Sequence, residues 1–393
     1  MHTKSVREKV IQVIDQNRDR LFDLSKSIFE EPELMFKEHK TVEKLLEELK
    51  RVDGIHIERG VANLETAFIA SLGGPKEQST IAMLAEYDAL PETGHGCGHN
   101  LICTSTVGAM LGLAPVIGKL PGRVELIGTP AEEGGGGKII MQEHGVFDHV
   151  DAMYSIHPQR FNAVGLKMLG AKQVRFKFKG KSAHAGATPH LGRSAVEAVI
   201  QTFVNVNGIR QYTTEDTRIH GIIEDGGTKA NEVPASGSCL VWVRALDEDY
   251  LEELMDRVIL CAKAAAMSTE TELEIAPGDG PYYRPLMCNQ MLTRVMREIL
   301  EDFGVTEFKD IKYTTGSNDM GPVSHEVPAS RAWLKICEEE IPIHSPQFAQ
   351  AAISEKGREV MILAAKLQAL TAIELLGNPR LLEEIKEEFH KSK

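Results

Sequence analysis

The sequence contains few cysteines, and nothing in their arrangement suggests a disulfide framework. There are 6 in 393 residues, scattered along the chain without paired spacing. Their positions are Cys97, Cys103, Cys239, Cys261, Cys288 and Cys337. A small domain held together by disulfides is therefore excluded, and a reducing compartment is favoured.

Long basic and apolar runs are also missing. The chain has 44 lysines and arginines against 57 aspartates and glutamates, a net charge of −13, and no basic run that would follow a phosphate backbone. We therefore expect no nucleic-acid partner. The first residues begin an amphipathic helix instead of an apolar signal core, and no segment approaches the ~18 apolar residues of a membrane span. We expect a cytoplasmic protein without a membrane partner.

The length and composition indicate a globular protein of two domains. A content of 42% hydrophobic and 26% charged residues is ordinary for a folded chain. A single hydrophobic core stops growing at about 250 to 300 residues, and this chain is longer.

Short apolar runs alternate with helix-length segments in the first part of the chain. The runs 80–85, 124–128 and 152–156 are bounded by turn residues and have the length of strands. This alternation predicts an α/β fold, in which a mostly parallel sheet is flanked by helices. Polar side chains follow each run, and ligands bind at the carboxyl edge of such sheets. We therefore expect a site at that edge.

The pattern changes near residue 171. Residues 173–179 and 239–244 alternate in polarity, whereas 194–208 and 250–267 have helical spacing. Half-solvated strands with helices indicate a small α+β layer structure. We expect an inserted domain at 171–280, within a larger domain formed by 1–170 and 281–393.

A glycine-rich loop carries the strongest chemical signal. Cys97 and His99 lie two residues apart, among Gly94, Gly96 and Gly98. A lone cysteine or histidine is usually a buried structural residue, but three glycines would weaken any helix or strand here. A loop bent to present a thiolate and an imidazole to a zinc-type ion explains the pattern better.

Three further patches could complete such a site. Glu132 and Glu133 follow an apolar run and precede four glycines, so that one carboxylate could bind metal while the other acts as general base. His157 and His344 each follow an apolar segment and have a proline within two residues. Each patch alone also fits a solvated turn or a structural histidine.

Together these motifs resemble a known family. The matching segments are 31–34, 84–91, 94–100, 129–134, 182–185, 316–319 and 344–346, in family order. The sequence resembles the dimetal amidohydrolases of the aminoacylase/carboxypeptidase metallopeptidase family. Within that family it is similar to the branch that contains one of the two subunits of p-aminobenzoyl-glutamate hydrolase and aminoacylase-like dipeptidases.

The resemblance implies a set of roles. Two divalent ions, zinc first and manganese, cobalt or nickel as alternatives, would be bound by Cys97, His99, Glu133, His157 and His344. Glu132 would be the general base and proton shuttle, and Cys97 or a solvent hydroxide would bridge the ions. The chain departs from relatives in having Glu86-Tyr87-Asp88 where other branches have His-x-Asp, and Asn100 where a sister branch has Asp.

The inserted domain would be a lid that also forms a homodimer or higher homo-oligomer. His184, His220, Asn231 and Arg244 match lid motifs and are candidates for binding a substrate carboxylate or the developing oxyanion. A packing or surface role for each is an equal alternative, because donor geometry cannot be read from sequence.

The expected reaction is hydrolysis of an amide in an N-acyl amino acid or aroyl-glutamate substrate. Two alternatives stay open. One is a dipeptidase or carboxypeptidase of the same family, which would use the same metals on a differently shaped substrate. The other, from a different class, is a catalytically silent binding or assembly subunit.

Overall fold

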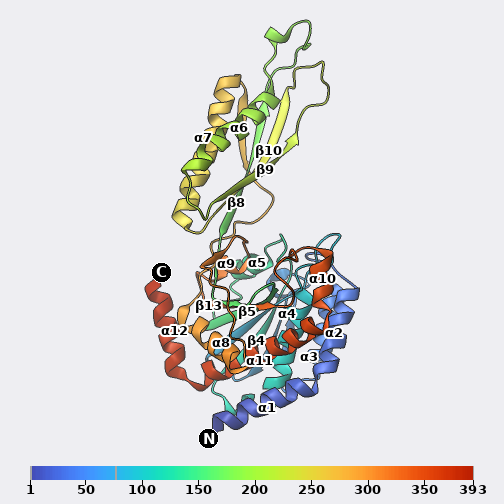
Figure 1. The fold of residues 1–393 in the computed structure, drawn as a ribbon, viewed down its shortest axis with the longest axis vertical. Coiled ribbons are helices and arrows are strands. Elements are labelled where there is room, and N and C mark those ends of the chain that lie inside the picture. Colours follow the sequence, from blue (N-terminus) through green and yellow to red (C-terminus); the bar gives the residue numbers. More distant parts are fainter. Residues whose placement is uncertain (1, 76–77, 393) are drawn as a thin grey trace. The chain divides into compact units, whose positions relative to one another are not determined.

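The structure is a computed structural model that describes residues 2–75 and 78–392. The chain forms two compact units (Figure 1). The larger unit combines Met1–Lys167, Met287–Lys312 and Pro322–Lys393, and the smaller unit combines Met168–Leu286 with Tyr313–Gly321. The smaller unit therefore takes in a short later segment in addition to its continuous stretch.

The larger unit contains a seven-stranded sheet and most of the helices. Its strands are β1 (His56–Arg59), β2 (Phe68–Gly73), β3 (Thr80–Glu86), β4 (Arg123–Thr129), β5 (Ala152–Gln159), β6 (Ala163–Val164) and β13 (Ala329–Lys335). Its helices are α1 (His2–Gln16), α2 (Arg18–Glu30), α3 (His39–Leu49), α4 (His99–Leu113), α5 (Gly137–Glu143), α8 (Gln290–Asp302), α10 (Pro346–Ala352), α11 (Glu355–Gly377) and α12 (Pro379–Ser392). Short 3-10 turns lie at Val61–Asn63 and Ile117–Lys119.

The strand order is β1-β2-β4-β3-β5-β13-β6. The four central strands, β4, β3, β5 and β13, are parallel, and the outer strands pair antiparallel. All seven residues of β3 are buried, as expected for a central strand covered on both faces. The prediction of a mostly parallel sheet flanked by helices is confirmed.

Helices α4 and α11 form the centre of the larger core. They pack against each other, and α4 also contacts β3 (Figure 1). By length and composition α11 could cross a membrane, which departs from the expectation that no segment approaches that length. Its most apolar window is 78% buried within the fold, so its apolar character is explained by packing.

The smaller unit is a four-stranded antiparallel sheet with two helices. Its elements are β8 (Gly170–Lys179), α6 (Ala195–Ile209), β9 (Arg218–Asp225), β10 (Ser236–Ala245), α7 (Glu248–Thr269) and β11 (Glu272–Pro277), with 3-10 turns at Pro189–Leu191 and Arg210–Tyr212. The strand order is β11-β8-β10-β9, and α6 and α7 pack on β8 and β10. Three short elements complete the fold: β7 (Lys167–Met168), β12 (Tyr313–Thr314), which pairs with β7, and α9 (Met320–Val323).

Candidate metal and catalytic site

Polar side chains from three neighbouring strands meet at the carboxyl edge of the larger sheet. Glu86 is the last residue of β3 and pairs in register with Thr129, the last residue of β4. Glu132 and Glu133 follow β4, and His157 lies near the end of β5. Because parallel strands end on the same side, segments far apart in sequence deliver their side chains to one place.

The glycine-rich loop brings Cys97 and His99 to the same edge. Gly98 has φ +76° and stands immediately before α4, which begins at His99. A Cβ at Gly98 would lie 2.9 Å from Cγ of Pro158, so both the backbone conformation and the space favour glycine. The loop also receives the last segment, because the backbone N–H of His344 donates to the Gly96 carbonyl at 2.9 Å.

The structure brings together all six side chains that the sequence suggested for the metal and base roles. Among the groups whose members all belong to the larger unit, three have ligand atoms that all lie within 4.8 Å of one another: Cys97, His99 and His157; Cys97, Glu133 and His344; and His99, Glu132 and Glu133. The first two groups share Cys97. The cluster therefore offers ligands for two neighbouring ions.

The two buried histidines are oriented by hydrogen bonds from their Nδ1 atoms. Nδ1 of His99 lies 2.8 Å from the Asp88 carbonyl oxygen and 3.0 Å from Asp88 Oδ1. Nδ1 of His157 lies 2.6 Å from the Pro158 carbonyl. In each case Nδ1 is the donor, so that Nε2 faces the cluster and offers its lone pair when the ring is neutral, as in metal-binding histidines.

Two atoms at the centre of the cluster are suited to a cation. His99 Nε2 and Glu133 Oε1 are buried and lack a hydrogen-bond partner among the described residues. They lie 3.9 Å apart. Buried polar atoms are normally paired, and a bound ion would satisfy both.

Burial and neighbouring charges shift the pKa values of the candidate ligands. Burial and the nearby Glu133 raise the pKa of the Cys97 thiol well above its usual value. Burial lowers the pKa of His99, but Cys97 and Asp88 outweigh it, so this pKa is raised. Burial and Arg331 lower the pKa of His157 well below its usual value, which keeps that ring neutral. A bound ion is what would hold Cys97 as thiolate and His99 without its second proton.

A buried ion network lies beside the cluster. Arg331 Nη2 is 2.6 Å and Lys138 Nζ is 2.9 Å from the Glu86 carboxylate, and all three side chains are at most 1% exposed. Burial alone would raise the pKa of Glu86, but Arg331 and Lys138 hold it well below its usual range. Glu86 is therefore ionised, and its Oε2 lies 3.9 Å from His99 Nε2.

Sequence reasoning gave no role to Asp88, Lys138 or Arg331. Asp88 holds the ring of His99, and its Oδ2 accepts the backbone N–H of Glu133 at 2.9 Å. A signal was present for Arg331, a charged residue in the middle of the mostly buried strand β13. Lys138, after four glycines, resembled a surface residue but is fully buried.

The four candidates for substrate binding lie in the smaller unit. His184 and Asn231 are exposed on adjacent loops, where Ala185 N donates to the Asn231 carbonyl at 2.9 Å. His220 stacks on Trp242 with ring centroids 6.2 Å apart, and Arg244 lies over the same indole ring at 5.0 Å. These residues form two small clusters, one on the loops and one on the sheet.

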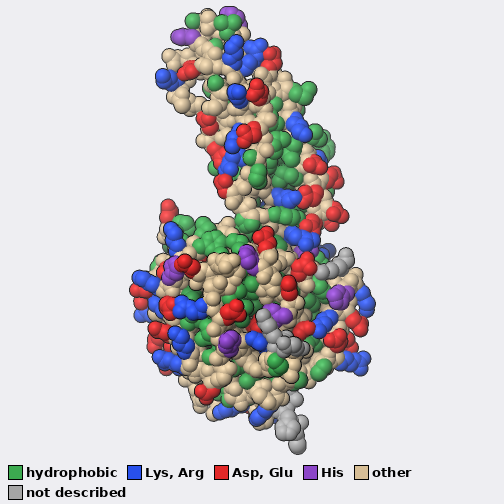
Figure 2. Space-filling view, turned by 180° about the vertical axis from the view of Figure 1, so that it is seen from behind, with side chains coloured by type: hydrophobic (Ala, Val, Ile, Leu, Met, Phe, Trp, Pro, Cys, Tyr) green, Lys and Arg blue, Asp and Glu red, His purple; other side chains and the backbone are tan. Residues whose placement is uncertain are grey.

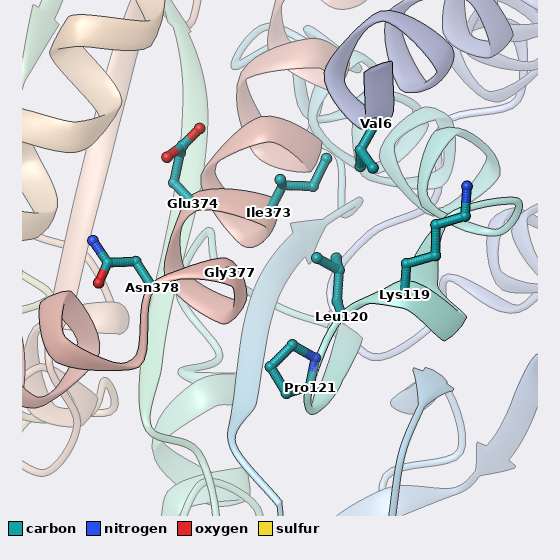
Figure 3. A pocket seen from close by; sticks show the side chains of 8 residues that line it. All are labelled: Val6, Lys119, Leu120, Pro121, Ile373, Glu374, Gly377 and Asn378. Atoms are coloured by element: carbon teal, nitrogen blue, oxygen red, sulfur yellow. The ribbon is translucent and has the colours of Figure 1, made fainter. Parts of the chain in front are cut away.

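A separate cavity of about 740 Å³ opens among α1, the segment 119–121 and the end of α11 (Figure 3). Apolar side chains such as Leu120 and Ile373 lie between Lys119 on one side and Glu374 and Asn378 on the other (Figure 3). None of the predicted metal ligands lines this cavity. We therefore do not connect it with the chemistry of the cluster.

Comparisons with known proteins show the family and the fold. The sequence model of "Peptidase family M20/M25/M40" matches residues 82–366. The chain is 32% identical to Xaa-Arg dipeptidase from Mus musculus, over 98% of this chain and 92% of that protein. It is 30% identical to one subunit of p-aminobenzoyl-glutamate hydrolase from Escherichia coli K12, over 95% and 93%. A putative aminohydrolase from methicillin-resistant Staphylococcus aureus has a similar fold, with a TM-score of 0.80, 20% identity and coverage of 94% and 100%.

Proposed function

The chain belongs to peptidase family M20/M25/M40 and is a metal-dependent amidohydrolase, and on this premise we propose that it hydrolyses the amide bond of an N-acyl amino acid or aroyl-glutamate substrate. The name of the Escherichia coli relative supports this substrate class. The observation that carries the proposal is the convergence of thiol, imidazole and carboxylate ligands around Cys97, with Glu132 beside them.

We propose that two divalent ions bind at this cluster. The ligands would be Cys97, His99, Glu133, His157 and His344. His99 Nε2 and Glu133 Oε1, which lack a hydrogen-bond partner among the described residues, support the assignment. The mixture of sulfur, nitrogen and oxygen ligands suits zinc, while manganese, cobalt and nickel are alternatives. When bound, such ions polarise a scissile carbonyl and make water acidic enough to be activated at neutral pH.

Glu132 is the proposed general base. Its side chain is 10% exposed, and its Oε2 lies 3.8 Å from His99 Nε2. It can therefore reach the cluster while keeping some access to solvent. In the proposed reaction Glu132 takes a proton from the attacking water and delivers it to the leaving nitrogen.

The substitution Glu132→Gln tests this role. We expect kcat to fall by about 10²- to 10⁴-fold, because the amide cannot accept the proton. Metal content, measured by mass spectrometry, should stay unchanged because the other ligands remain. Glu143→Gln, at an exposed residue that ends α5, is the matched control and should keep its activity. Near-normal kcat in a metal-loaded Glu132→Gln variant would show that another group is the base.

We propose that His184, His220, Asn231 and Arg244 bind the substrate carboxylate or the developing oxyanion. The surroundings of His184 support a donor role. Its Nδ1 accepts the backbone N–H groups of Gly186 and Ala187 at 3.2 and 3.1 Å, so the neutral ring carries its proton on Nε2. Nη1 of Arg244 donates a hydrogen bond to Ser317 Oγ at 3.2 Å. A guanidinium has five N–H donors, so other N–H groups of Arg244 can bind an anion.

The main alternative is a dipeptidase, which the name of the mouse relative supports. Both reactions use the same ligands and the same base. The discriminating experiment is a panel of aroyl-glutamates, N-acetyl amino acids and dipeptides, including dipeptides with a carboxyl-terminal arginine, assayed with protein loaded with each metal. A kcat/KM that is highest for dipeptides would favour the alternative.

We also propose a cytoplasmic location and a homodimer formed through the smaller unit. The location follows from the expectation of a reducing compartment. Support for the dimer comes from β9, which lies at the edge of its sheet and exposes Ile222 and Ile223, 61% and 49% accessible. Apolar side chains are also exposed on this unit (Figure 2). An open apolar edge strand is a natural surface for pairing with a second copy.

A further inference from the structure

One buried carboxylate holds two unusual turns beside the cluster. Phe36 and Ala131 are not glycines, yet they have φ values of +60° and +57°. The backbone N–H groups of both donate to Oε1 of Glu38, at 3.0 Å for Phe36 and 2.9 Å for Ala131. A left-handed conformation is unfavourable for residues with a Cβ, and it persists only where the surroundings hold it.

Glu38 has no surface role that would explain its presence. Its side chain is fully buried. Burial raises the pKa of this carboxyl to about 7, which shows that the ionised form is costly in this environment. The backbone of Glu38 makes a hydrogen bond at the start of α3, because its carbonyl accepts the N–H of Val42 at 2.9 Å. The side chain is not needed for that contact and instead reaches Ala131, 93 positions along the chain.

The turn that Glu38 holds leads directly into the catalytic pair. Ala131 immediately precedes Glu132, and the backbone N–H of Glu133 is held by Asp88 Oδ2 at 2.9 Å. The carboxylates of Glu38 and Asp88 therefore fix the backbone on both sides of Glu132. We propose that Glu38 is a positioning residue, which fixes the direction of Glu132 by clamping the left-handed turn at Ala131. This inference rests on the proposed role of Glu132 as base.

Two substitutions of Glu38 distinguish the effect of the position of its acceptor oxygen from the effect of its charge. Glu38→Gln loses the charge but keeps an acceptor oxygen at the same reach. Glu38→Asp keeps the charge but withdraws the oxygen by roughly 1.5 Å, the length of one carbon–carbon bond. If Glu38 acts by position, Gln should keep kcat within about threefold of the unsubstituted enzyme. Asp should lower kcat tenfold or more while KM changes less than threefold, because misplacing a catalytic group slows chemistry more than binding.

A second readout needs no substrate. Hydrogen exchange at the Ala131 amide measures the clamp directly, and protection should be kept in Glu38→Gln and reduced in Glu38→Asp. The matched control is the same pair of substitutions at Glu33, whose carboxylate accepts from Thr41 N and Oγ1 at 2.8 and 3.0 Å without touching the catalytic turn. Those control variants should keep kcat and Ala131 protection.

The outcomes separate the two proposals. If the unsubstituted enzyme cleaves no amide in the substrate panel, the proposed function fails, and Ala131 exchange alone decides whether the clamp exists. If the enzyme is active but Glu38→Asp matches or exceeds Glu38→Gln in kcat, the positioning role is overturned. Unchanged protection of Ala131 in Glu38→Asp would overturn it as well.

Discussion

At the scale of single residues, buried carboxylates organise the site as much as the ligands do. Asp88 orients the ring of His99 and holds the backbone of Glu133 with the same side chain. Glu86 is held ionised by Arg331 and Lys138. Outer groups of this kind fix the geometry and basicity of metal ligands, and their loss typically costs 10- to 100-fold in metal affinity or activity.

The protonation of the ligands predicts a pH-dependent metal affinity. The pKa values of Cys97 and His99 are both raised, so both groups hold protons at neutral pH until an ion displaces them. Affinity should therefore rise with pH, by about tenfold per pH unit for each proton released. Competition with a chelator at pH 6.5 and 8.0 measures the slope, and removal of the metal should abolish hydrolysis. An affinity that is flat or falls over this range would contradict the assigned protonation states.

At the scale of elements, the start of α4 depends on a glycine. Gly98 combines φ +76° with close contact to Pro158, and His99 is the first residue of the helix. An alanine at this position must either strain the backbone or push the segment that follows His157 away. Gly98 therefore fixes both the start of α4 and the position of His99, a proposed metal ligand.

Gly98→Ala should lower both stability and metal affinity. We expect a loss of roughly 1 to 3 kcal/mol in the free energy of unfolding, because a left-handed conformation and a steric contact are both unfavourable. Denaturation in urea measures this loss. Gly118→Ala is the matched control, because nothing lies within 4 Å of its Cβ position, and it should change stability by less than about 0.5 kcal/mol. Equal stabilities for the two variants would refute the packing argument.

At the scale of the whole molecule, each unit has its own core and its own surface. The core of the larger unit surrounds α4 and α11, whereas the smaller unit packs α6 and α7 on its sheet. The proposed metal ligands all belong to the larger unit, and the exposed edge strand β9 belongs to the smaller one. Assembly and metal binding should therefore be separable by mutation.

A charge on the edge strand should prevent assembly without removing the metal. We expect the unsubstituted protein to be a dimer in light scattering after size-exclusion chromatography, and Ile222→Lys to be a monomer with full metal content. A lysine on an edge strand opposes pairing between sheets. Leu34→Lys, at a side chain in the larger unit that is 40% exposed, is the control and should remain dimeric. A monomeric unsubstituted protein at micromolar concentration would rule out the proposed dimer.

Local patterns in the sequence determined the fold class. The buried strands β3, β4 and β5 were visible as apolar runs, since a central parallel strand needs apolar side chains on both faces. Strands β9 and β11 were not predicted, because most of their residues are exposed and they lack clear alternation. The glycine-rich loop and the glutamate pair were visible because their residue types are unusual at those places.

Only the tertiary structure decided what supports the site. The ion pair between Arg331 and Glu86 joins residues 245 positions apart, and the bond between Glu38 and Ala131 joins residues 93 apart. Sequence spacing carries no information about such contacts, because sheet topology and backbone dihedral angles create them. The sequence by itself determined which side chains could bind metal. Their arrangement, and the carboxylates that fix them, required the chain to be folded, since partners from distant segments become neighbours only in the packed core.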